Sequence, residues 1–186
     1  FHLLDSPKDN FSIIYYISES VNNENEFYKK LFHHILEKMT KTKKYITLIK
    51  TAAKAVPHSI ESIGPEGIKF RQESSINYYD ELTGFIRALP PNDDKFIVLI
   101  DEFASTVENI LLDEGDRAAQ HFLQTKRSLR QIPETHKRLE FVYAGSIGLE
   151  NIVGRLNSAN LVNDLAPIQI PPLTKSESLA LTEKIL

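Results

Sequence analysis

The chain has 186 residues, a net charge of −3 and a pI of about 6.1, and 41% of its residues are hydrophobic. These values fit one globular domain with an ordinary core and argue against a surface built mainly for nucleic acid, although they leave room for a local basic patch. The absence of cysteine excludes disulfides and cysteine-ligated zinc. No apolar run approaches the roughly 18 residues of a membrane span, and no leader-like segment opens the chain. We therefore expect a cytoplasmic protein.

The first half of the chain predicts a strand, two helices, a hairpin and a third helix. β-Branched and aromatic residues fill 11–17, which predicts a buried strand. Apolar residues spaced four apart from Phe27 to Met39 predict an amphipathic helix, with Asn23 or Asn25 as its cap. The predicted elements that follow are a helix at 45–56, a β-hairpin formed by 59–63 and 68–71 outside the main sheet, and a helix at 78–89.

The second half alternates strands and helices again. Its predicted elements are a strand at 96–100, a short helix at 105–112, an amphipathic helix at 118–131, a buried strand at 139–144, a helical stretch at 149–156, a short fourth strand at 168–170 and a helix that starts at 176. Lys126, Arg127 and Arg130 suit the C-terminal end of their helix, where the helix dipole favours positive charge. Strands separated by helices predict an α/β fold with a mainly parallel sheet and helices on both faces.

The stretch 95–103 organises the rest of the chain. Five apolar residues in a row run straight into Asp101 and Glu102. A strand with no polar alternation is typical of a sheet covered on both faces, and ligands bind beyond the carboxyl ends of such strands. Two adjacent carboxylates repel each other, and a hydrated Mg²⁺ with a phosphate is the simplest reason to keep them. The plain alternative is that a buried strand leaves the core there, where acids are common.

A second polar strand end completes the predicted site. The strand at 139–144 is followed by Gly145 and Ser146, where a hydroxyl can approach a ligand closely. If the two strand ends lie side by side, Asp101 would hold the water shell of Mg²⁺ and Glu102 would orient an attacking water. Ser146 would then hydrogen-bond that water or the γ-phosphate. This arrangement predicts phosphoryl transfer, which depends mostly on positioning and charge neutralisation.

The order of these motifs resembles that of the P-loop ATPases of the AAA-like and signal-transduction (STAND) group of bacteria and archaea. The matching stretches are 96–103 with the Walker B strand, 141–149 with the first-sensor strand, 165–181 with the final strand and the lead into a helical lid, and 64–70 with a hairpin found before Walker B. The resemblance covers nearly the whole chain. It implies a three-layer P-loop NTPase-like sheet, with 1–172 as the ATPase core and 173–186 as the start of the lid.

The resemblance also implies ATP and Mg²⁺ as cofactors. Asp101 would be the metal ligand, Glu102 the water-orienting base and Ser146 the sensor. Arg155 and Arg127 are the arginines that we expect to sense phosphate. The domain would couple its nucleotide state to a protein partner that the sequence does not identify, and oligomerisation stays open.

One departure from the family pattern concerns the phosphate-binding loop. None of the seven glycines is followed by lysine, so the chain has no Gly-x-x-x-x-Gly-Lys-Ser/Thr motif. In the family this loop precedes the strand that matches 11–17, and its strand is central, between those matching 139–144 and 168–170. The chain starts at Phe1 rather than Met, so we expect it to be the downstream part of a longer ATPase domain and to be inactive alone.

Two other functions remain open from the sequence. One is a degenerate form that has lost the loop and serves as a protein-interaction scaffold. The other is a nuclease or phosphatase that uses Asp101, Glu102 and further acids with metal ions, although the remaining acids of this region lie in predicted turns, where solvated carboxylates are normal.

Overall fold

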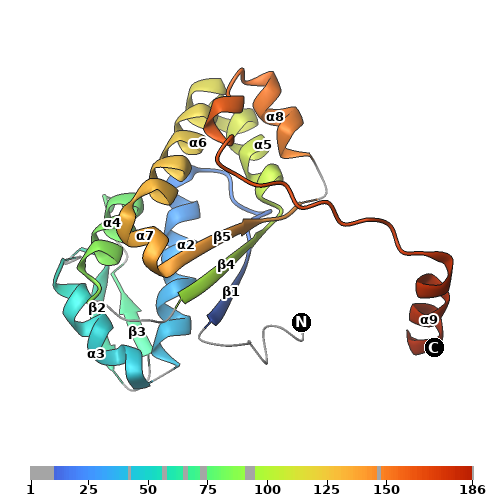
Figure 1. Ribbon diagram of the computed structural model, residues 1–186. Helices are drawn as coiled ribbons and strands as arrows, with labels where there is room; N and C mark the ends of the chain where they lie inside the picture. The colour runs from blue at the N-terminus through green and yellow to red at the C-terminus, as the bar shows by residue number, and fades with distance from the viewer. Residues whose placement is uncertain are drawn as a thin grey trace.

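A three-stranded parallel sheet forms the centre of the protein (Figure 1). The computed structural model describes residues 11–41, 43–55, 58–64, 67–71, 75–90, 95–145 and 148–185. The strands are β1 (Phe11–Ile17), β4 (Lys95–Asp101) and β5 (Leu139–Tyr143), in the spatial order β1-β4-β5. The parallel α/β architecture is therefore confirmed. The strand that leads into Asp101 and Glu102, which we call the acid pair, lies in the middle of the three.

The helices up to residue 138 connect these strands, and two further α-helices follow the last strand. They are α2 (Glu24–Thr40), α3 (Lys43–Ala52) with a short 3₁₀ helix at Ala53–Ala55, α4 (Tyr78–Ala88), α5 (Phe103–Glu114), α6 (Asp116–Gln131), α7 (Pro133–Arg138), α8 (Leu149–Arg155) with a 3₁₀ helix at Ala159–Leu161, and α9 (Lys175–Ile185). Asn23 caps α2 by accepting a hydrogen bond from the Glu26 amide at 2.9 Å, as predicted. The turn α7 was not predicted; it begins with Pro133, whose fixed φ suits a first helical position.

The core lies between one face of the sheet and the helices α2, α4 and α6. Phe96, Val98 and Ile100 of β4 are buried on this face, and the alternation of side chains along a strand places them together. Aromatic rings fill the layer above them, with Phe27 of α2 and Phe122 of α6 meeting edge to face at 5.0 Å. This packing is what fixes the helices against the sheet.

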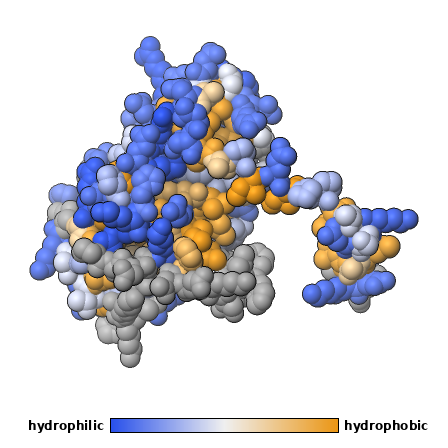
Figure 2. Space-filling model, in the orientation of Figure 1, coloured by the Kyte–Doolittle hydropathy of each residue, from blue (hydrophilic) through white to orange (hydrophobic). Residues whose placement is uncertain are grey.

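The opposite face of the sheet differs from the prediction. The residues of β4 that point to it, among them Ile97 and Leu99, are only half-buried, and Ile17 of β1 and Val142 of β5 are 54% and 38% exposed. Helices were expected on both faces, but within the described part of the chain none covers this one. We call this face the open face. Figure 2 shows apolar residues at the surface over the strands and along the segment that leads to α9.

The predicted fourth strand at 168–170 is wrong for the described chain. Residues 166–174 form no strand, and Ile168 and Ile170 are 79% and 89% exposed. A strand needs a neighbour for its N–H and C=O groups, and no described strand lies beside this segment. The segment leads away from the body to α9, which stands apart from the sheet (Figure 1).

The β-hairpin lies outside the main sheet, as predicted. Its strands are β2 (Ile60–Gly64) and β3 (Gly67–Phe70), which pair antiparallel. Within the part of the chain that the structure describes, no helix is both long and apolar enough to cross a membrane.

Candidate functional site

The exits of β4 and β5 lie side by side at the carboxyl edge of the sheet. The Ala144 amide donates to the carbonyl of Ile100 at 2.9 Å, and the Phe103 amide donates to the carbonyl of Ala144 at 3.1 Å. The parallel ladder therefore continues past the last residue of each strand. On the other side, Asp101 is in register with Ile17 of β1. The predicted adjacency of the two strand ends is confirmed as far as Gly145.

Asp101 is oriented by the neighbouring strand. Its Oδ2 accepts a hydrogen bond from the Tyr15 hydroxyl at 2.6 Å, and its Oδ1 accepts one from the Glu102 amide at 3.0 Å. The hydrogen bond to Asp101 raises the pKa of Tyr15, and partial burial adds to this. Strand alternation puts Asp101 on the same side as Leu99, so its carboxylate lies at the end of the open face.

Glu102 has a left-handed backbone at the junction of β4 and α5. Its φ of 54° and ψ of 35° lie in the region that only glycine enters at little cost, and the strain is roughly 1–2 kcal/mol. Such conformations cluster at functional sites. The Oε2 of Glu102 accepts a hydrogen bond from the Ser105 hydroxyl at 3.1 Å and lies 3.6 Å from the Cβ position of Gly145. The exit of β5 therefore passes beside this carboxylate.

Hydrogen bonds from two buried hydroxyl groups link the acid pair to the end of β1. Ser18 donates from both its amide, at 3.0 Å, and its hydroxyl, at 2.9 Å, to the carbonyl of Asp101. Thr106 of α5 donates to the Ser18 carbonyl at 2.7 Å. Both side chains are fully buried. These contacts fix the end of β1, the end of β4 and the start of α5 relative to one another, as a site that acts by positioning requires.

The structure describes the two predicted arginines, Arg155 and Arg127, but not the predicted sensor. Ser146 lies outside the described residues, so its role stays a prediction. Arg155 forms an ion pair with Glu108 of α5 at 3.5 Å, and 61% of its side chain is exposed. The Arg127 guanidinium donates to the carbonyl of Asn160. Neither of these two contacts is to Asp101 or Glu102, and the phosphate-sensing role of both arginines also stays a prediction.

Sequence reasoning missed Tyr15, Ser18 and Thr106. Tyr15 and Ser18 bond to Asp101 across 86 and 83 residues, and Thr106 bonds to Ser18 across 88 residues. Tyr15 lies two positions before the end of β1, on the same face as Asp101. That relationship depends on the register of β1 against β4, which no local pattern encodes.

The donor set fits a Mg²⁺ ion that is shared with a phosphate. Among the described residues, no group of three or more His, Asp or Glu side chains is placed to hold a metal by itself. Mg²⁺ keeps several waters and is usually held by one or two carboxylates together with phosphate oxygens. Asp101 offers one oriented carboxylate of this kind, with Glu102 beside it.

The chain matches no protein-family model, no curated protein and no solved structure.

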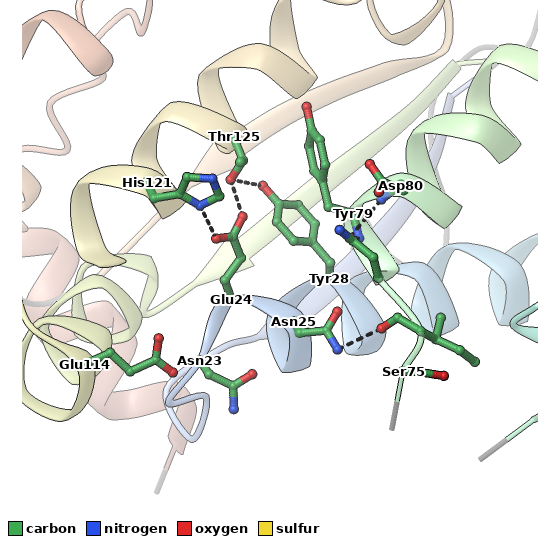
Figure 3. A pocket seen from close by; sticks show the side chains of 12 residues that line it. Asn23, Glu24, Asn25, Tyr28, Ser75, Tyr79, Asp80, Glu114, His121 and Thr125 are labelled. Atoms are coloured by element: carbon green, nitrogen blue, oxygen red, sulfur yellow. Dashed lines mark hydrogen bonds and ion pairs between the residues drawn. The ribbon is translucent and has the colours of Figure 1, made fainter. Parts of the chain in front are cut away.

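A hollow of about 680 Å³ lies elsewhere, between the N-terminal ends of α2 and α4 and the helices α5 and α6 (Figure 3). Its central carboxylate, Glu24, accepts a hydrogen bond from Thr125 at 2.6 Å and lies 2.6 Å from Nδ1 of His121. The Tyr28 hydroxyl donates to Thr125 at 2.9 Å. Both oxygens of Glu24 are thus occupied by α6, so these contacts explain the cluster as a brace between α2 and α6.

Proposed function

We propose that the chain is the Walker B and sensor half of a P-loop ATPase of the AAA-like/STAND group, and that the complete protein binds and hydrolyses ATP. The observation that carries this proposal is the acid pair on the central strand. Asp101 is oriented by Tyr15, and Glu102 lies beside the exit of β5. The acid pair lies at the carboxyl end of a parallel strand, and this is the end at which such sheets bind their ligands.

The two carboxylates would divide the chemistry between them. Asp101, fixed through both oxygens, would hold the water shell of Mg²⁺. When bound, the metal neutralises charge on the phosphates. The Ser105 hydroxyl donates to Oε2 of Glu102, and this carboxylate would accept the hydrogen bond of the attacking water. Ser146 would act as the sensor of the γ-phosphate, and Arg155 and Arg127 are the candidate phosphate-sensing arginines.

The edge of the sheet at β5 and the open face have room for a further strand and a helix, which would bear the phosphate-binding loop. β5 pairs only with β4 among the described strands, and Val142 on its open face is 38% exposed. A parallel strand added at this edge would end next to Gly145. A helix after it would cover the open face, on which Asp101 lies. The segment 168–170 would then have a neighbour to pair with, which accounts for the apolar side chains that it now exposes.

The scaffold function is the alternative, and one observation favours it. The chain carries no Gly-Lys pair, so by itself it has neither the backbone cradle nor the lysine that bind the β- and γ-phosphates. In that case the acid pair would be a remnant, and the open face and edge would serve protein contacts.

Mg-ATP titration of two polypeptides separates these functions. Isothermal titration calorimetry would compare the 186-residue chain with a product that is extended upstream by about thirty residues, the length of a loop-bearing strand and helix. We expect no binding by the former and Mg²⁺-dependent binding by the latter. In the extended product, Asp101→Asn should weaken binding in the presence of Mg²⁺, whereas Asp113→Asn, at the end of α5, serves as the matched control. If the extended product binds no nucleotide, the scaffold function stands.

A further inference from the structure

Lys126 is a buried amine that the proposed ATPase site does not use. It lies in the middle of α6, its side chain is fully buried, and its Nζ has no hydrogen-bond partner among the residues that the structure describes. The sequence interpretation, in which Lys126 complements a helix end together with Arg127 and Arg130, is wrong for Lys126. The side chain points into the core instead of the solvent.

Four aromatic rings from two elements surround the amine. The Nζ of Lys126 lies 4.9 Å from the ring centroid of Phe27 and 5.8 Å from that of Tyr28, both on α2. It lies 4.5 Å from the centroid of Phe141 and 5.5 Å from that of Tyr143, both on β5. We call this arrangement the aromatic box. Because α6 supplies the lysine, the box joins α6, α2 and the edge strand β5 at one point.

The charged and titratable groups around the box do not neutralise an ammonium. On α6, Arg130 lies one turn further on, and its charge is shared with Asp164 at 2.7 Å. On α2, the Glu24 carboxylate is linked to Tyr28 of the box through Thr125, and its two oxygens are taken up by Thr125 and His121.

The two phenols of the box remain neutral as well. Burial raises the pKa of Tyr143 on β5 to about 12 and that of Tyr28 on α2 well above its usual value. Neither can therefore supply a negative charge to the amine. Burial, and then the charge of Arg130, lower the pKa of Lys126 well below its usual value. The rings attract a cation, but a fully desolvated ammonium also loses all its hydrogen bonds to water.

We propose that Lys126 is a proton-operated latch, in which the neutral amine fills the aromatic box and holds β5 against α2 and α6, and proton uptake from solvent by Nζ releases that contact. The latch does not depend on the ATPase proposal, because it rests on the burial and surroundings of the Lys126 amine and not on a nucleotide. Its consequence for the site is direct, since β5 leads into Gly145 beside Glu102. Release would loosen the strand exit that borders the acid pair.

The sign of the pH effect follows from linkage. The lysine of the unfolded chain has a pKa of about 10.4, and the folded chain binds fewer protons between the lowered pKa and that value. The stability that this group contributes therefore grows as the pH rises through this window. It is smallest below the lowered pKa, where the ammonium is forced into the box or the box opens.

Two measurements on the 186-residue chain test the latch. In a chain labelled with ¹³C at lysine Cε, the Lys126 resonance is assigned by through-bond experiments and titrated from pH 5 to pH 11. We expect it to titrate well below the other lysines. Hydrogen-exchange protection of the β5 amides, taken relative to the β1 amides to remove the intrinsic pH dependence, should fall as the pH drops through the same midpoint.

The variants sharpen the second measurement. Lys126→Met fills the box with an uncharged chain of similar length, and it should abolish the pH response of β5, whereas Lys50→Met, on the exposed surface of α3, should keep it. A Lys126 resonance that titrates with the other lysines overturns the proposal without recourse to any variant. So does a β5 pH response that persists in Lys126→Met.

Discussion

The hydroxyl of Tyr15 lies 2.6 Å from the Oδ2 of Asp101, so a side chain of β1 fixes the carboxylate at the end of β4. Their separation of 86 residues shows that this is a tertiary relationship between adjacent parallel strands. The second oxygen of Asp101 is held by the amide of Glu102. The carboxylate is thus oriented before any ligand arrives, which is the condition for positioning a metal without a further loss of freedom.

The first prediction concerns this hydrogen bond. In the complete protein, Tyr15→Phe should raise the Mg²⁺ concentration needed for half-maximal ATP hydrolysis by about 3- to 10-fold, which corresponds to a net hydrogen-bond contribution of about 0.7–1.4 kcal/mol. Turnover at saturating Mg²⁺ should change less. Tyr79→Phe, on α4 and away from the strand ends, is the matched control. A Mg²⁺ dependence identical to that of the wild type would mean that Tyr15 only packs against β4.

The second prediction concerns the backbone of Glu102. Because its φ of 54° suits glycine, Glu102→Gly should raise the free energy of unfolding by about 0.5–1 kcal/mol while hydrolysis is lost. Urea denaturation of both proteins measures the difference. Glu102→Ala removes the same carboxylate but keeps the strain, so it should not gain this stability. Equal stabilities of the Gly and Ala variants would show that the left-handed backbone carries no cost.

The sequence was enough to predict the central strand and its acid pair, because an apolar run that ends in two carboxylates is a local pattern. The hydrogen bond from Tyr15 to Asp101 depends on strand register, and the network of Ser18 and Thr106 depends on how β1 meets α5. No window of sequence contains either relationship. These contacts therefore had to come from the structure.

Helical periodicity indicates that Lys126 is buried, but its charge led to the interpretation that it complements the end of the helix. It falls four residues after Phe122 and three before Leu129, on the apolar stripe of α6, so helical periodicity places it in the core. The segment 168–170 shows the reverse error. Its apolar pattern is that of a strand, but a strand also needs a partner, and the described chain provides none beside it.

The third prediction concerns the ion pair of Arg130 with Asp164. Arg130 is buried, and its Nε and Nη2 donate to the two carboxylate oxygens at 2.9 and 2.7 Å. Asp164→Asn should lower the free energy of unfolding at pH 7 by about 1–3 kcal/mol, because a buried guanidinium loses its charged partner.

The pH dependence of that pair has a definite sign. The hydrogen bond from Arg130 lowers the pKa of Asp164, so the stability from this pair is present above the unfolded value of about 3.9 and is lost as the pH falls through the lowered pKa. The wild type and Asp164→Asn should therefore converge in denaturant midpoint between pH 4 and pH 2. A difference that stays constant over this range would contradict the assignment.

The central claim is that Glu102 orients the water that attacks the γ-phosphate. Its most direct test is the rate of ATP hydrolysis by the complete protein with Glu102→Gln, measured together with retention of radiolabelled ATP. Loss of a group that positions and polarises the nucleophile should slow turnover by about 100-fold or more while ATP stays bound. Glu114→Gln, at the exposed end of α5, should hydrolyse ATP normally. Hydrolysis by Glu102→Gln at the wild-type rate would contradict the account.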